Sequence, residues 1–339
     1  MNFKKHIIPI LLCASFTSYA QTTSISDATQ KDDKSIIKIT RATDTTARTS
    51  NTAKKMPNGK AEIQNVKVLN GSKDDFSPLF FENGLLYCSN SRKIKKGEDA
   101  DKVPEDLNLK YASFDTLGKL SKPTSFGKRT NSKTHEGPSC FTKSGDSLFL
   151  TRNMSKGGID KKSKNGLFTL KIYLKTRDTL GSFVGDKLLP FEIGDYSYCH
   201  PTLSADGRRL YFSSNMPGGF GGMDLYMIRK TNDSTWSAPI NLGARVNTPK
   251  NEVFPFMQDN GMLYFSSNGL HKGKGGLDIF AIEIEKRNGM AIPMTEPFNT
   301  EGDDFGIMFL PNTLNKGYFS SNRAGGSGGD DIYSFEIKE

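Results

Sequence analysis

Four acidic residues recur at one position of a repeated pattern, and they are the first candidates for chemistry in this sequence. Asp75, Glu136, Glu252 and Asp304 each stand at the start of a short strand-like run. A ring of carboxylates at the rim of a channel can bind a hard cation, since calcium takes oxygen ligands. The alternative is that each carboxylate accepts hydrogen bonds from backbone N–H groups of its own loop and recurs because the loop recurs. We expect the second arrangement, and we predict neither a metal ion nor a cofactor.

The histidines do not complete a catalytic set. The chain has four of them, His6, His135, His200 and His271, and His200 interrupts the acidic pattern near the third repeat. The sequence contains neither Gly-x-Ser-x-Gly nor His-Glu-x-x-His, the motifs of common hydrolases and metalloproteases. His135 and Glu136 are adjacent, but neighbours on a strand point to opposite faces. We therefore predict no catalytic residues and no enzymatic activity.

Glycine-rich segments such as residues 218–222 invite comparison with phosphate-binding loops. They lie between two predicted strands, they open no helix, and no Lys-Ser/Thr pair follows them, so the comparison fails. Tight turns explain them better, because glycine adopts backbone conformations that other residues avoid. Asn and Asp side chains beside each segment are predicted to hold its backbone. These are Asn215, Asn268, Asn322, Asp224, Asp278 and Asp331.

The elements that position these residues belong to a repeat. Leu-Tyr-Phe-Ser-Ser-Asn occurs at residues 210–215 and 263–268, and Gly-Tyr-Phe-Ser-Ser-Asn at residues 317–322, so the repeats begin 53 and 54 residues apart. Weaker copies lie at residues 86–90 and 148–153. A period of this length with several strands per repeat is typical of a β-propeller. The sequence predicts an all-β fold, a five-bladed propeller, and leaves a sixth, short blade open at residues 191–201.

The two ends of the repeat array complement each other. The segment at residues 63–69 precedes the first complete repeat and is predicted to be an outer strand without a blade of its own. The last repeat ends at Glu339 without an outer strand. We therefore predict that the N-terminal strand completes the last blade and closes the ring, which removes an exposed sheet edge.

Composition and charge indicate an exported protein and argue against nucleic-acid binding and a membrane span. Residues 1–20 read as a signal peptide, with a basic start, a short apolar core and a small-residue cleavage site. Residues 21–60 are too polar to fold alone and are predicted to be a disordered leader, so the propeller occupies residues 61–339. The net charge of +9 is concentrated at the N-terminus, since residues 58–339 carry 37 basic and 33 acidic side chains. A nucleic-acid partner and a membrane span are therefore not expected.

Three cysteines remain after the predicted cleavage, namely Cys88, Cys140 and Cys199. Their odd number and strand-like positions favour buried free thiols over a disulfide framework. A single disulfide with one thiol left over is the alternative.

The repeat formula resembles that of TolB-like, WD-repeat-like periplasmic propellers. It is most similar to the propeller module of OmpA-family envelope proteins associated with type IX secretion and gliding machinery, over about residues 62–339. The resemblance implies a periplasmic location, at the outer membrane or the cell surface. Those relatives usually carry a peptidoglycan-binding domain after the propeller, and this sequence ends with the propeller. Direct peptidoglycan binding is therefore not implied.

The resemblance favours a non-catalytic scaffold of the cell envelope, with an envelope protein such as an outer-membrane β-barrel protein as its partner. The alternative is a periplasmic propeller that binds a small ligand or a cation, and a propeller lyase or hydrolase is the third candidate. For the scaffold, the glycine-rich loops are predicted to present the partner-binding face, because backbone at glycine approaches a partner closely and Met and Phe supply apolar anchors. The residues predicted for this face are Met216, Phe220, Met223, His271 and Arg323.

Overall fold

The computed structural model describes residues 59–90, 106–127, 130–132, 134–156, 159–160, 162, 166, 168–192, 194–232 and 235–338. Every named regular element in these ranges is a β-strand. No helix in this part of the chain is long and apolar enough to cross a membrane. The predicted signal peptide, residues 1–20, and all but the last two residues of the predicted leader, residues 21–60, lie outside the described ranges.

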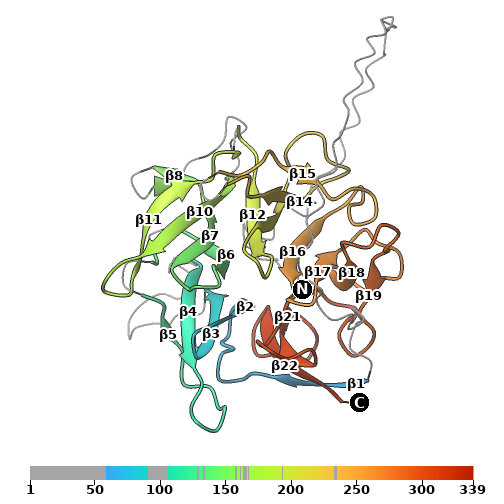
Figure 1. The fold of residues 1–339 in the computed structure, drawn as a ribbon. Coiled ribbons are helices and arrows are strands. Elements are labelled where there is room, and N and C mark those ends of the chain that lie inside the picture. The colour runs from blue at the N-terminus through green and yellow to red at the C-terminus, as the bar shows by residue number, and fades with distance from the viewer. Residues whose placement is uncertain are drawn as a thin grey trace, which may run out of the picture. The chain divides into compact units, whose positions relative to one another are not determined.

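Five four-stranded antiparallel sheets form the five blades of a propeller (Figure 1). In each blade we call the strands A, B, C and D from the centre outward. Blade 1 contains β2 (Asp75–Phe81), β3 (Gly84–Ser89), β4 (Asn108–Ser113) and β5 (Thr124–Ser125). Blade 2 contains β6 (Glu136–Phe141), β7 (Ser147–Asn153), β10 (Leu170–Arg177) and β11 (Phe183–Leu188). A separate hairpin between its strands B and C consists of β8 (Ser155–Lys156) and β9 (Ile159–Asp160).

The remaining blades follow the same plan. Blade 3 contains β12 (Tyr198–Leu203), β13 (Arg209–Ser214), β14 (Asp224–Arg229) and β15 (Ile240–Asn241). Blade 4 contains β16 (Glu252–Met257), β17 (Met262–Ser267), β18 (Asp278–Glu283) and β19 (Ile292–Pro293). Blade 5 contains β20 (Asp304–Phe309), β21 (Lys316–Ser321), β22 (Asp331–Lys338) and β1 (Lys60–Asn65). The five-bladed prediction is confirmed, and the described residues between β11 and β12 contain no strand of a sixth blade.

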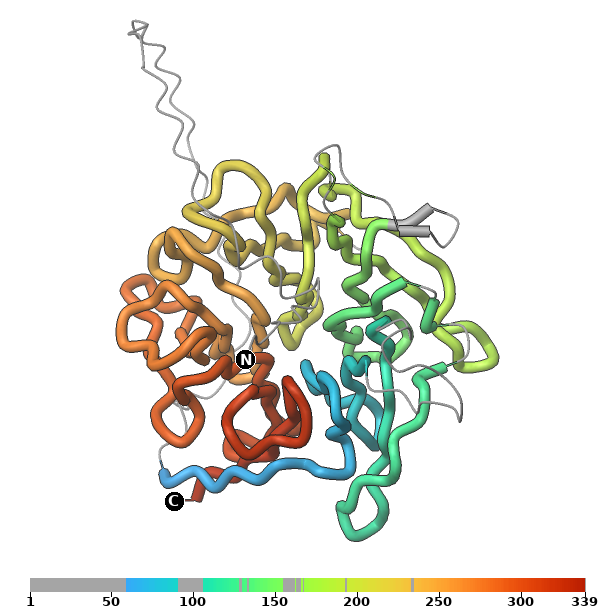
Figure 2. The backbone as a smooth tube through the Cα atoms, turned by 180° about the vertical axis from the view of Figure 1, so that it is seen from behind, coloured from blue at the N-terminus to red at the C-terminus, as the bar shows by residue number. Residues whose placement is uncertain are grey.

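The ring closes as the sequence predicts. β1 pairs with β22 in antiparallel register from Lys60 opposite Lys338 to Asn65 opposite Tyr333. Figure 2 shows β1, in blue, running along the red C-terminal blade before the chain turns inward to blade 1. The predicted strand at residues 63–69 is displaced toward the N-terminus. It ends at Asn65 because residues 66–70 turn, with Leu69 N–H donating to Val66 O.

The A strands form the wall of the central channel. Each packs against the A strands of the next and the previous blade, and β2 meets β20 where the ring closes. The largest core cluster contains residues from all five blades, among them Phe76, Leu148, Cys199, Val253 and Phe305. Further clusters fill the interfaces between consecutive blades. Strand B is buried along nearly its whole length in each blade, because blades pack against it from both sides.

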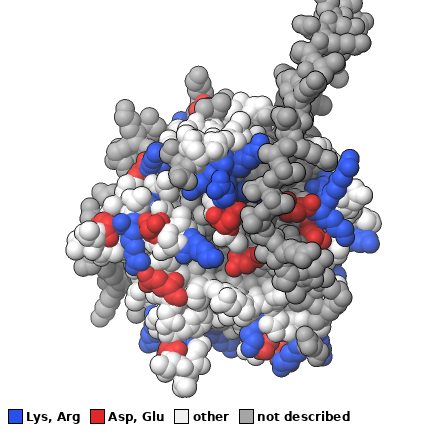
Figure 3. Space-filling model, viewed as in Figure 1, with Lys and Arg blue, Asp and Glu red and all other residues white. Residues whose placement is uncertain are grey.

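Burial also settles the state of the cysteines. Cys88, Cys140 and Cys199 are buried free thiols, which confirms the prediction made for them. On the face drawn in Figure 3, basic and acidic side chains are interspersed rather than gathered by sign. This arrangement agrees with the near balance of charge in residues 58–339.

Candidate functional site

Every A strand contains a bulge at the same place. The pairing of strands A and B shifts register between Phe76 and Leu79 in blade 1 and between Val253 and Phe256 in blade 4. The other three blades show the same shift at equivalent positions. A bulge releases a residue from the ladder and redirects its side chain, and bulges are common beside active sites.

The residue at the centre of the bulge has an unusual backbone conformation. Ser77, His200 and Phe254 have φ angles of 53°, 55° and 51°, and Gly306 has a φ angle of 60° at the same position in blade 5. A bulky side chain at positive φ is strained, and such strain persists where the surrounding structure enforces it, often at ligand sites. In blade 2 the residue at the centre of the bulge is Pro138, whose ring fixes φ at a negative value.

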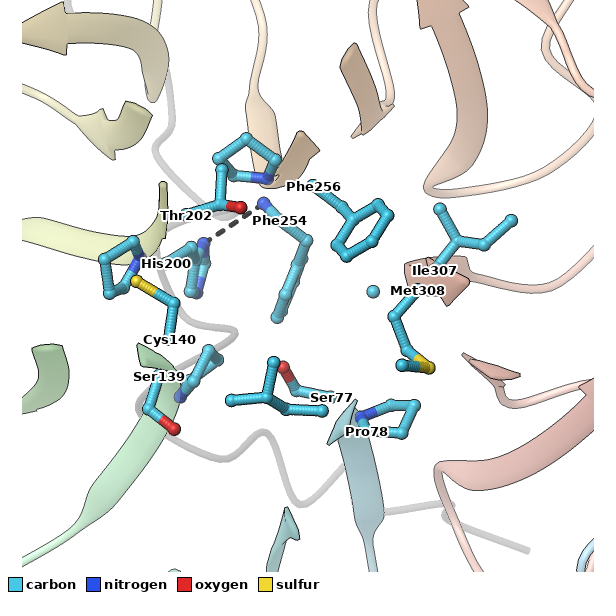
Figure 4. A pocket seen from close by; sticks show the side chains of 15 residues that line it. Ser77, Pro78, Ser139, Cys140, His200, Thr202, Phe254, Phe256, Ile307 and Met308 are labelled. Atoms are coloured by element: carbon cyan, nitrogen blue, oxygen red, sulfur yellow. Dashed lines mark hydrogen bonds between the residues drawn. The ribbon is translucent and has the colours of Figure 1, made fainter. Parts of the chain in front are cut away.

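These five bulges line one cavity in the channel. The cavity has a volume of about 60 Å³, and three consecutive residues from each A strand form its wall. Figure 4 shows these side chains converging from all five blades. Four of the fifteen lining residues are prolines: Pro78, Pro138, Pro201 and Pro255. Proline has no N–H group, so this part of the wall offers few backbone donors.

His200 contributes an imidazole ring to this wall. It is 4% exposed, and its ring stacks on that of Phe254 with centroids 3.9 Å apart. Its Nδ1 accepts a hydrogen bond from the backbone N–H of Phe254 at 3.3 Å, drawn as a dashed line in Figure 4. Burial lowers the pKa of His200 to about 3. The ring is therefore neutral at pH 7 and carries its proton on Nε2, because Nδ1 is an acceptor.

Nε2 of His200 has no hydrogen-bond partner among the described residues. The ring is held from two other directions. The backbone N–H of His200 donates to Thr151 Oγ1 of blade 2 at 2.9 Å, and Nδ1 is occupied by Phe254. An N–H donor thus lies in a buried site without an acceptor, which is unfavourable unless a ligand or water accepts from it.

The four acidic residues at the starts of the A strands are loop clamps. All four are 0% exposed. Each accepts a hydrogen bond from the backbone N–H four residues earlier, at 2.6–2.8 Å: Asp75 from Gly71, Glu136 from Ser132, Glu252 from Thr248 and Asp304 from Thr300. Burial raises the pKa of Glu136 to about 7, although Ser132, Arg152 and Lys175 oppose this shift. Among the described residues no group of three or more His, Cys, Asp or Glu side chains is placed to hold a metal ion.

The repeated Ser-Ser-Asn triplet connects strands and blades. In blade 5 the hydroxyl of Ser320 accepts from the bulge N–H of Ser77 in blade 1 at 2.8 Å. The hydroxyl of Ser321 donates to Asp304 at 2.6 Å, and Oδ1 of Asn322 accepts from the N–H of Asp303 at 2.7 Å. The triplet is therefore structural, as predicted for Asn322.

One glycine in each of three glycine-rich loops permits close contact with the following loop. A Cβ atom on Gly221 would lie 2.4 Å from the backbone of Thr248 and Pro249, and Gly275 and Gly328 meet the next loop in the same way. Asp224 accepts from the N–H groups of Phe220 and Gly221. Glycine is required here for close approach between backbones.

We expect Gly221→Ala to lower the free energy of unfolding by roughly 2–4 kcal/mol, because the added methyl group displaces backbone rather than a flexible side chain. Urea unfolding monitored by circular dichroism measures the loss. Pro217→Ala, an exposed change in the same loop, is the matched control and should change stability by less than about 1 kcal/mol. Equal effects of the two substitutions would contradict this explanation of the loop.

The predicted partner-binding face does not assemble as expected. Phe220 is 48% exposed and His271 is exposed, but Met223 is 1% exposed and belongs to the central core cluster. Met216 is half-buried and packs on the core between blades 2 and 3. The guanidinium group of Arg323 binds Asp304 and the carbonyl oxygens of Pro297 and Phe298. Met223 and Arg323 are therefore structural, since neither side chain is free to meet a partner.

The bulge residues Ser77, Phe254 and Gly306 were missed by the sequence analysis. A signal was present, because Ser77, His200 and Phe254 each precede a proline. Proline within a predicted inner strand indicates a bulge or an edge. Asp330 was also overlooked. It is 6% exposed and occupies the position of the buried apolar residues Met223 and Leu277 in blades 3 and 4.

Comparisons with known proteins find the fold but no family. No family model matches the chain, and no curated protein matches it. TolB from Acinetobacter baumannii is 13% identical, with a TM-score of 0.41, and the match covers 80% of this chain and 56% of that one. An α-L-arabinofuranosidase from Lactobacillus brevis is 10% identical, with a TM-score of 0.48 and coverages of 80% and 92%. An endo-arabinase from Bacteroides thetaiotaomicron is 14% identical, with a TM-score of 0.48 and coverages of 80% and 96%.

The comparisons support the TolB-like propeller fold and contradict the predicted function. We predicted a non-catalytic scaffold without enzymatic activity, but the similar solved structures include glycoside hydrolases. The prediction was wrong to exclude catalysis from missing sequence motifs, because function depends on sites rather than on the fold. At these identities the likeness shows the fold alone, so it assigns neither a reaction nor a substrate to this chain. The scaffold role is not retained.

Proposed function

We propose that this protein binds a small neutral ligand in the central channel, with a hydrogen-bond acceptor of the ligand on Nε2–H of His200. The observation that carries the proposal is the convergence of five bulged strands on the cavity that contains this donor. No charged side chain lines the cavity among the described residues, which favours a neutral group. A volume of about 60 Å³ suits a single small group, since water occupies about 30 Å³ in the liquid.

The geometry favours binding over an assigned reaction. Glycoside hydrolysis, for example, usually requires a pair of carboxyl groups beside the substrate. The described residues that line the channel cavity include no carboxyl group. Asp75, Glu136, Glu252 and Asp304 are all buried in their loop clamps.

We also propose that binding takes place in the cell envelope, in the periplasm or at the cell surface. The signal-like residues 1–20 and the resemblance to OmpA-family modules of type IX secretion support this location. The predicted envelope-protein partner stays a prediction.

Matched substitutions of His200 test the channel site. His200→Asn keeps an acceptor for the Phe254 N–H group and tolerates positive φ, but it removes the donor. His200→Gln places an amide N–H near the position of Nε2. With acetamide as the probe, we expect His200→Asn to weaken binding about fivefold, and His200→Gln to retain more of it, because one hydrogen bond contributes about 1 kcal/mol net.

Ligand-observed NMR titration of the full chain measures these affinities, and thermal unfolding checks that both variants are folded. At best acetamide will bind with a dissociation constant of roughly 10–100 μM, given its few atoms. No saturable binding to the wild type, or equal binding to a folded His200→Asn variant, would overturn the proposal.

A further inference from the structure

A larger cavity adjoins the channel on the face where strands A and B are connected. Its volume is about 430 Å³, within the range of about 300–1,000 Å³ that is typical of ligand pockets. Its walls come from blades 4, 5 and 1, and Leu79, Phe256 and Met308 line both this cavity and the channel cavity. A ligand can therefore extend from one into the other along an apolar wall.

The cavity lies where the propeller departs from its own repeat. The connection between β20 and β21, residues 310–315, is the longest A–B connection, one residue longer than residues 142–146 in blade 2 and 204–208 in blade 3. The longer connection adds Leu310, Pro311 and Leu314 to the cavity wall, and Leu314 is 51% exposed. The apolar residues of this connection thus form a wall that the polar connections of the other blades do not have at this position.

One buried polar group in this cavity has an unused acceptor. Gln258 is 5% exposed, and its Nε2 donates to the carbonyl oxygen of Thr313 at 3.4 Å. Its Oε1 has no partner among the described residues. If the side-chain amide were flipped, Oε1 would face the carbonyl oxygen of Thr313, and two acceptors would meet. The amide is therefore oriented with Nε2 toward Thr313. A donor on a ligand would satisfy Oε1.

The spacing of the two unpaired groups suggests the length of the ligand. Gln258 follows Phe254 by four residues and lies just beyond the end of β16. At about 3.3 Å per residue their Cα atoms are at most about 13 Å apart, and the bulge at Phe254 shortens this distance. The ring of His200 stacks on that of Phe254. Gln258 lines the larger cavity and His200 lines the channel cavity, and the apolar side chains of Leu79, Phe256 and Met308 line both.

We infer that the ligand is an elongated, largely apolar, neutral molecule with a hydrogen-bond acceptor at one end and a donor up to about 13 Å away. The acceptor end lies at His200, and this part of the inference rests on the proposed function. The apolar body lies in the larger cavity against Phe256 and Met308, and the donor reaches Oε1 of Gln258. A fatty primary amide with a terminal hydroxyl group, such as 10-hydroxydecanamide, has this chemistry.

Three probes separate the parts of this inference: acetamide, decanamide and 10-hydroxydecanamide, titrated by ligand-observed NMR against the full chain. Decanamide should bind at least 100-fold more tightly than acetamide, because each buried methylene group adds about fourfold. Gln258→Met, which removes the acceptor and keeps the bulk, should reduce the preference for 10-hydroxydecanamide over decanamide by about fivefold.

Leu314→Glu places a charge on the wall of the larger cavity and should weaken decanamide at least tenfold while acetamide is unaffected. Leu117→Glu, a change of another exposed leucine that lines neither cavity, is the control and should affect neither probe. If acetamide binding depends on His200 but decanamide binds no more tightly than acetamide, this inference is overturned and the proposed channel site is not. No binding of any probe would overturn both, as would be expected if only water occupies the cavities.

Discussion

Deletion of residues 59–65 is expected to lower the free energy of unfolding by roughly 4–6 kcal/mol, a large part of the 5–15 kcal/mol typical of a domain. This deletion removes β1, which pairs with β22 along six residues. It also removes Ala61, which is buried in the core between blades 4 and 5, and the Asn65 amide that donates to Asp331 at 2.8 Å. Urea and thermal unfolding measure the change.

Loss of β1 also exposes the edge of β22, a long strand with a ladder of unpaired backbone groups. Size-exclusion chromatography should therefore show aggregation of the truncated chain. The control is deletion of residues 22–57, which the sequence predicts to be a disordered leader, and its unfolding midpoint should match that of the wild type. Equal midpoints for the two truncations would show that β1 does not close the ring.

Asp330→Leu is expected to stabilise the protein, and by more at high pH than at low pH. Asp330 is 6% exposed in the centre of the propeller, where blade 4 has Leu277. Burial, together with Asp74, Asp303 and Asp331, raises its pKa to about 8. The folded state therefore holds the Asp330 proton more tightly than the unfolded state, whose value is about 3.9.

The direction of the pH dependence follows from this difference. Because the folded-state pKa is the higher one, the cost of ionising Asp330 is nearly absent below pH 4 and grows as the pH rises toward 8. We expect Asp330→Leu to gain roughly 5–7 kcal/mol over the wild type at pH 8–9, and about 1–2 kcal/mol at pH 4 from apolar burial alone.

Urea unfolding at pH 4, 7 and 9 measures these differences. Asp330→Asn separates charge from hydrophobicity, since it removes the charge and keeps the shape, so its gain should be confined to high pH. Asp259→Asn, at an exposed position, should change nothing. A pH-independent difference between Asp330→Asn and the wild type would show that Asp330 ionises normally.

The fold can be read from the amino-acid sequence because the same local contacts are encoded in every repeat. The Ser-Ser-Asn triplet, the acidic residue that begins strand A and the glycine-rich loop each form contacts within one blade or to the next. The copies at residues 210–215, 263–268 and 317–322 therefore predict the same strand geometry in three blades. The missing outer strand of the last repeat predicted the role of β1 for the same reason.

The position of the candidate site, in contrast, becomes apparent only in the folded protein. The cavity at His200 forms from three residues on each of five strands that are far apart in the sequence, and no local pattern brings Ser77, Phe254 and Gly306 together. Whether Met223 or Arg323 faces solvent also depends on packing from neighbouring blades. Local contacts are encoded within each repeat, whereas the channel belongs to the closed ring, and its unpaired donor and acceptor become visible only when every neighbouring strand is in place.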